Sequence, residues 1–128
     1  MYENQYDDLQ VNPVLAEVMA RHMEATGFEH LATEKETPGS TDIGNVSYRC
    51  PVMYGNVGIA GGKVTVHEEA FIEHADSEEA HTRILQTVES FVCSALELYN
   101  SPETMEKVRQ VFVEMTKAPL NRDGTKGQ

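Results

Sequence analysis

Three amphipathic helical patterns surround one short, broken stretch of strand-like residues in this chain. Apolar residues recur at helical spacing within residues 12–27, 76–100 and 101–115. Strand-like residues gather between positions 46 and 66, where Pro51, Gly55 and Gly58 interrupt them. Two or three short strands would leave sheet edges unpaired. The pattern therefore predicts a part of a larger α/β fold, or a chain that needs a partner.

Capping residues predict where the helices begin and end. Asn12 and Ser101 each precede a proline, the arrangement typical of a helix start. Asp76 with Glu79 three residues later predicts a capping box at the start of the long helix. Gly27 is expected to end the first helix. The organisation predicted is a connector over residues 1–11, a folded part over 12–117 and a disordered tail over 118–128.

Composition narrows the class of protein. The 128 residues include 21 acidic and 10 basic side chains, for a formal net charge of -11. This balance argues against a nucleic-acid partner and against an anionic membrane surface. No apolar run approaches the roughly 20 residues that cross a bilayer, and the acidic start lacks the features of a secretory signal. We expect a soluble, cytoplasmic protein.

Two cysteines, Cys50 and Cys93, do not make a disulfide framework. Cys93 lies on a helical apolar stripe and Cys50 in a strand-like run, so both are expected to be buried thiols. No pair of cysteines has the spacing of a cysteine zinc site.

The histidines offer one candidate metal ligand. His67 and His74 lie seven residues apart, whereas a zinc-protease helix needs a spacing of four. On residue types alone, His67 is expected to be an exposed loop histidine. His22 lies on the apolar stripe of the first helix and is expected to be a partly buried structural residue.

Residues 39–47 form a small, polar, glycine-containing string, Gly-Ser-Thr-Asp-Ile-Gly-Asn-Val-Ser. Glycine permits close backbone approach, so such a loop is suited to contact a ligand. The string is no phosphate loop, because it lacks the lysine that reaches the phosphates.

This string, Pro51 after it, His67 beyond, and the later run Ser-Ala-Leu-Glu-Leu at residues 94–98 resemble the C-terminal part of a known enzyme family. The family is that of the aminoacylase/carboxypeptidase-type zinc amidohydrolases (metallopeptidase family 20). The aminoacylase-like dipeptidases and p-aminobenzoyl-glutamate hydrolases are the most similar branch. The resemblance covers roughly residues 11 to 115 and implies the C-terminal portion of an α/β catalytic domain, with a mixed sheet flanked by helices, incomplete in this chain.

The resemblance also implies site residues. His67 would be a ligand of zinc or another divalent metal, and the residues expected to contact substrate are Gly39, Ser40, Thr41, Asp42 and Asn45. The other ligand motifs of the family are absent from the chain. A catalytic zinc needs several protein ligands to activate water, so the metal would bind only if the missing ligands are supplied elsewhere.

The expected function is therefore that of a C-terminal segment of a metal-dependent amidohydrolase or dipeptidase, inactive as an isolated chain. Its substrate would be an N-acyl amino acid or a dipeptide, and its partner a companion chain or a second copy. The alternative is a non-catalytic protein-interaction module or the remnant of a truncated gene.

Overall fold

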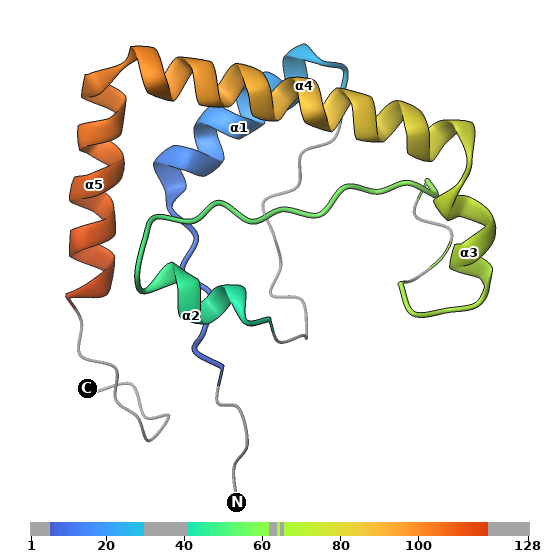
Figure 1. The fold of residues 1–128 in the computed structure, drawn as a ribbon, viewed down its shortest axis with the longest axis horizontal. Coiled ribbons are helices and arrows are strands. Elements are labelled where there is room, and N and C mark those ends of the chain that lie inside the picture. Colours follow the sequence, from blue (N-terminus) through green and yellow to red (C-terminus); the bar gives the residue numbers. More distant parts are fainter. Residues whose placement is uncertain (1–5, 30–40, 62–63, 65, 118–128) are drawn as a thin grey trace, which may run out of the picture.

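The computed structural model describes residues 6–29, 41–61, 64 and 66–117. These residues form helices α1 (Pro13–Ala25), α2 (Ile43–Ser47), α3 (Ala70–Ala75), α4 (Glu78–Asn100) and α5 (Pro102–Thr116). Figure 1 shows the long α4 with α3 near its N-terminal end and α5 turning away at its C-terminal end. Helix α1 packs against both α4 and α5. The packed part of the fold is thus a cluster of three helices, α1, α4 and α5, which all contact one another.

The predicted mixed sheet is wrong, because the described part of the chain contains no strand. A single parallel β-bridge joins Val11 to Val52, with the Val52 carbonyl accepting from the Asn12 amide at 2.7 Å. Val46 belongs to helix α2, and the stretch after Val52 is irregular. Pro51 precedes this stretch and two glycines interrupt it, and among the described residues no neighbouring strand is available to pair with it. Of the expected strand at residues 63–66, positions 63 and 65 lie outside the described residues, and Val64 and Val66 lie in a bend and a turn.

Helix α1 begins as its capping residues predict. The Asn12 side-chain oxygen accepts from the amides of Val14 and Leu15 at 3.1 and 3.2 Å. Its side-chain amide donates to the Val108 carbonyl of α5 at 3.0 Å, and the residue is buried. Gly27 follows the end of α1 with φ +99°, a conformation that favours glycine. Asn12 therefore both starts α1 and joins it to α5.

The predicted cap of the long helix is wrong by one residue. Asp76 ends the short helix α3, and Ser77 caps α4 by accepting from the Ala80 amide at 3.1 Å. Ala80, in this first turn of α4, is fully buried. Ser101 caps α5 as predicted, accepting from the Thr104 amide at 3.3 Å.

Helix α4 packs on α1 through small and polar residues. The Ser90 hydroxyl lies 2.7 Å from that of Thr26, and the Ser94 hydroxyl lies 3.4 Å from the sulfur of Met19. Both serines are buried, and each hydroxyl also donates to a backbone carbonyl one turn earlier. Small side chains let the two helix backbones approach closely, with the polar atoms satisfied locally.

The apolar face of α4 points away from this contact. Leu85 is 70% exposed, Val92 53% and Tyr99 88%. The other large apolar residues on α4 that are exposed are Ile84, Val88, Phe91 and Leu96. The resemblance implies helices that flank a mixed sheet, but in the described part of the chain no element packs on this face. A contiguous apolar surface of this kind is typical of an interaction site.

Glu97 links α4 to α1 by charge. Its carboxylate accepts from Arg21 at 2.7 and 3.2 Å and lies 2.8 Å from Nε2 of His22. The hydrogen bond from Arg21, and then that from His22, lowers the pKa of Glu97 below its usual 4.5. His22 is thus a half-buried structural residue, as predicted.

We expect Glu97→Gln to lower the free energy of unfolding at neutral pH and to have less effect in acid. A carboxylate with a lowered folded pKa stabilises the fold above its unfolded pKa and loses that contribution as the pH falls through the folded pKa. The difference from wild type should therefore shrink below the usual pKa of 4.5. Urea titrations at several pH values measure it, with Glu89→Gln on an exposed position of α4 as the control.

Both cysteines are free, as predicted, but their predicted burial is wrong: Cys50 is exposed and Cys93 half-buried. None of the helices in the described ranges has the length and apolar character that crossing a membrane requires. The predicted tail over residues 118–128 lies outside the described residues.

Candidate functional site

The predicted substrate-binding string forms the start and body of helix α2. The Thr41 hydroxyl accepts from the Ile43 amide at 3.3 Å, and the Thr41 carbonyl accepts from the Gly44 amide at 3.1 Å. Asp42 occupies the N-cap position with an exposed side chain that makes no capping hydrogen bond. Gly39 and Ser40 lie outside the described residues. Thr41 is therefore placed as a helix-initiating residue and Asp42 as an exposed carboxylate.

The N-terminal segment, residues 7–11, lies against α2. The Asn45 side-chain oxygen accepts from the Asp7 amide at 2.7 Å, and the Ser47 hydroxyl oxygen accepts from the Gln10 amide at 3.0 Å. The same Ser47 hydroxyl donates to the Gly44 carbonyl at 2.6 Å and is buried. Two residues of the string thus hold the main chain of a distant segment.

Gly44 makes this contact sterically possible. A Cβ built on Gly44 would overlap the backbone carbonyl of Asp7. The next residue beyond α2 adds a side-chain contact, because the Tyr48 hydroxyl donates to the Asp8 carboxylate at 2.6 Å. Burial, and then that hydrogen bond, raises the pKa of Tyr48 to about 12. The hydroxyl therefore stays protonated, and remains a donor, at any physiological pH.

His67 lies apart from α2. It is exposed, has φ 71°, and belongs to the turn that leads into α3. Figure 1 shows α2 and α3 at opposite ends of the extended stretch that joins them, and within the described residues these two helices make no contact. The structure brings Thr41, Asp42 and Asn45 together and leaves His67 outside that group.

The metal-binding donors of the described residues do not fit a catalytic metal centre. No three His, Cys, Asp or Glu side chains lie together in these ranges. Two of the histidines pair with single carboxylates, His22 with Glu97 at 2.8 Å and His81 with Asp76 at 3.0 Å. His67 would therefore have to share a metal with ligands that this part of the chain does not supply.

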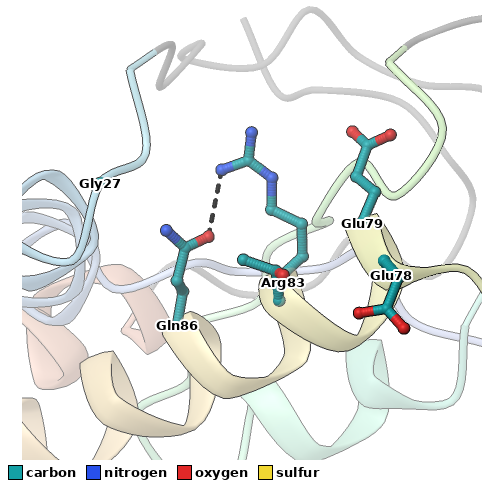
Figure 2. Close-up of a pocket in the computed structure, with 6 residues that line it drawn as sticks. Gly27, Glu78, Glu79, Arg83 and Gln86 are labelled. Carbon is teal, nitrogen blue, oxygen red and sulfur yellow. Dashed lines mark hydrogen bonds between the residues drawn. The ribbon is translucent and has the colours of Figure 1, made fainter.

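A pocket of about 360 Å³ opens between the end of α1 and the first turns of α4 (Figure 2). Arg83 donates to Gln86 at 3.2 Å, and its guanidinium lies 5.0 Å from the ring centre of Phe28. Gln86 in turn donates to the Thr26 carbonyl at 2.8 Å. The polar side chains at this pocket join the two helices, and Thr41, Asp42, Asn45 and His67, the predicted site residues that the structure describes, do not line it.

Ser47 and Tyr48 are the contacting residues to which sequence reasoning gave no role. Ser47 is only the last residue of the string, and Tyr48 falls in the range, 46 to 66, where the pattern predicts strands. The signal that points to them is Gly44: a glycine followed at once by hydrogen-bonding side chains indicates a backbone brought close to another backbone.

Comparisons with known proteins give two relatives. A stretch of 74 residues is 36% identical to the Xaa-Arg dipeptidase of Homo sapiens, covering 58% of this chain and 17% of that protein. Over 110 residues the chain is 28% identical to the Xaa-Arg dipeptidase of Mus musculus, covering 84% of this chain and 25% of that protein. No protein-family model and no solved structure matches. The chain spans a quarter or less of these relatives, and it is distantly related to dipeptidases.

Proposed function

We propose that this chain acts as the C-terminal part of a dipeptidase-type hydrolase whose remaining parts come from a companion polypeptide. The observation that carries the proposal is the 36% identity to Xaa-Arg dipeptidase over 74 residues. That similarity supports a hydrolase of dipeptides or related amides. The small share of the relatives that is covered, 17% and 25%, supports dependence on further chain.

The exposed apolar face of α4 supports the proposal, because it offers a surface on which the companion could dock. Seven large apolar side chains along one helix of 23 residues are between 53% and 88% exposed. At about 25 cal/mol per Å² of apolar surface, covering such a face stabilises an assembly substantially. The same helix meets α1 with its small and polar side, so docking leaves that contact intact.

The active site of the assembly would be shared. His67 would be one metal ligand and the companion would supply the others, because the described donors form no group of three. Residues 39–42 and Asn45 would contact the substrate. The Asn45 oxygen that now accepts a peptide amide from Asp7 is chemically suited to accept one from a dipeptide.

Complementation tests the proposal. The human Xaa-Arg dipeptidase is prepared without the segment that this chain matches, and the chain is added in zinc-containing buffer. Hydrolysis of a dipeptide with a C-terminal arginine is then followed by release of the free amino acid. We expect neither part to act alone and the mixture to hydrolyse the dipeptide while co-eluting on size-exclusion chromatography.

The outcomes separate clearly. A mixture that neither co-elutes nor hydrolyses the dipeptide contradicts the proposal. Activity of the isolated chain, with stoichiometric zinc bound, contradicts the shared site. Association without hydrolysis favours the second candidate function, a non-catalytic interaction module, which the exposed face of α4 also supports.

A glutamate on the exposed face of α4 should affect docking and leave the fold alone. Val92 is 53% exposed, so Val92→Glu is expected to change the free energy of unfolding of the isolated chain by no more than about 0.5 kcal/mol. The same change would put a charge in the middle of the docking surface and abolish co-elution. Urea denaturation and chromatography measure the two effects, with Glu114→Gln, at an exposed position of α5, as the matched control.

A further inference from the structure

The contact between α2 and the N-terminal segment has the character of a peptide-binding site. Asn45 and Ser47 each accept from a main-chain amide of the segment, at 2.7 and 3.0 Å. Val52 accepts a third main-chain amide, from Asn12 at 2.7 Å, beside the parallel bridge to Val11. Main-chain amides are common to all extended peptides, so these acceptors recognise a backbone conformation more than a sequence.

One contact adds side-chain selectivity. The Tyr48 hydroxyl donates to the Asp8 carboxylate at 2.6 Å. A carboxylate accepts a stronger hydrogen bond than a neutral group does. The site therefore favours an acidic residue one position after the residue that donates its amide to Asn45.

Gly44 shapes the floor of the site. A side chain there would overlap the Asp7 carbonyl, so the peptide backbone lies directly on the backbone of α2. The contacts at Asp7 and at Asp8 are both exposed to solvent. Segments held by few, exposed contacts open locally at low free-energy cost.

We propose that Gly44, Asn45, Ser47 and Tyr48 form a receptor for an extended acidic peptide, which the chain's own residues 7–11 fill in cis and which a peptide in trans enters when they leave. This site shares Asn45 with the proposed substrate contacts but does not involve the apolar face of α4, and binding of the peptide can be tested without any hydrolase activity. Occupation in cis lowers the apparent affinity for the competing peptide by the fraction of molecules in which the site is open.

The test uses the full chain with its own segment weakened. Asp7→Pro with Gln10→Pro removes the two amide donors and leaves the receptor unchanged, whereas Asp7→Ala with Gln10→Ala keeps both amides as the matched control. The probe is a fluorescent peptide with the sequence of residues 6–12. We expect the proline variant to bind the probe saturably and at least about tenfold more tightly than the wild type or the alanine control.

Where the proline variant folds, two outcomes overturn the proposal. One is a proline variant with native circular dichroism that does not bind the probe, and the other is equal binding to wild type and variant. Adding Tyr48→Phe to the proline variant should weaken its binding of the probe. If the proline variant fails to fold, wild-type chain is titrated with excess unlabelled peptide, and the absence of any shift in the Asn45 and Tyr48 amide signals overturns the proposal.

Discussion

Replacing Asn12 by alanine is expected to lower the free energy of unfolding by about 2–3 kcal/mol. The substitution removes the cap of α1, because the side-chain oxygen accepts from Val14 and Leu15. It also removes the donor to the Val108 carbonyl on α5, at a fully buried position. Chemical denaturation followed by circular dichroism measures the change.

Asn12→Ser divides this effect into its two parts. Serine is a good N-cap but is too short to replace the amide that reaches Val108. We expect the serine variant to lie between the wild type and Asn12→Ala. An alanine variant as stable as wild type would show that Asn12 does not join α1 to α5.

Gly44→Ala is expected to cost about 1–3 kcal/mol, the range for inserting a methyl group into a filled space. Its Cβ would overlap the Asp7 carbonyl, so either the N-terminal segment detaches or α2 shifts. If the segment detaches, the loss in the free energy of unfolding cannot exceed what the contacts of the segment contribute to stability. Urea denaturation gives the free energy, and loss of the Asp7 and Gln10 amide protection identifies detachment.

Gly58→Ala is the matched control. A Cβ built on Gly58 meets no atom within 4 Å in the described part of the chain beyond its two sequence neighbours, so this substitution adds a methyl group without a clash. We expect its stability to stay within about 1 kcal/mol of wild type. Equal effects at both positions would contradict a close backbone contact at Gly44.

Helix starts could be predicted where the signal is local. Asn12 and Ser101 cap their helices because a short polar side chain followed by proline satisfies the free amides of the first turn. The prediction of where α4 starts was wrong because two neighbouring residues can both serve as the cap. Asp76 is the C-terminal cap of α3, and the next residue, Ser77, is the N-terminal cap of α4.

The sheet could not be predicted correctly because strand-like residue types do not form strands without partners. Val46 lies in α2, where the hydrogen bonds of Thr41 and Ser47 favour a helical turn. The apolar face of α4 was located correctly, but its expected partner was a sheet that is not formed in the described ranges. A periodic pattern identifies a face and does not say what covers it.

The candidate site was predicted in part. The string was expected to allow close approach, and Gly44 does, but the group it approaches is the chain's own Asp7. The role of Asn45 in substrate binding and of His67 in metal binding stay predictions. The contact with residues 7–11 is between segments 37 and 38 positions apart, and no local rule connects them.

Amide hydrogen exchange at Asp7 and Gln10 tests most directly whether α2 holds the N-terminal segment. Their amides donate to the Asn45 and Ser47 side chains, so both should exchange more slowly in the wild type than in a variant carrying Asn45→Ala and Ser47→Ala. An unchanged exchange rate at both amides in a variant that keeps its helices would contradict the contact.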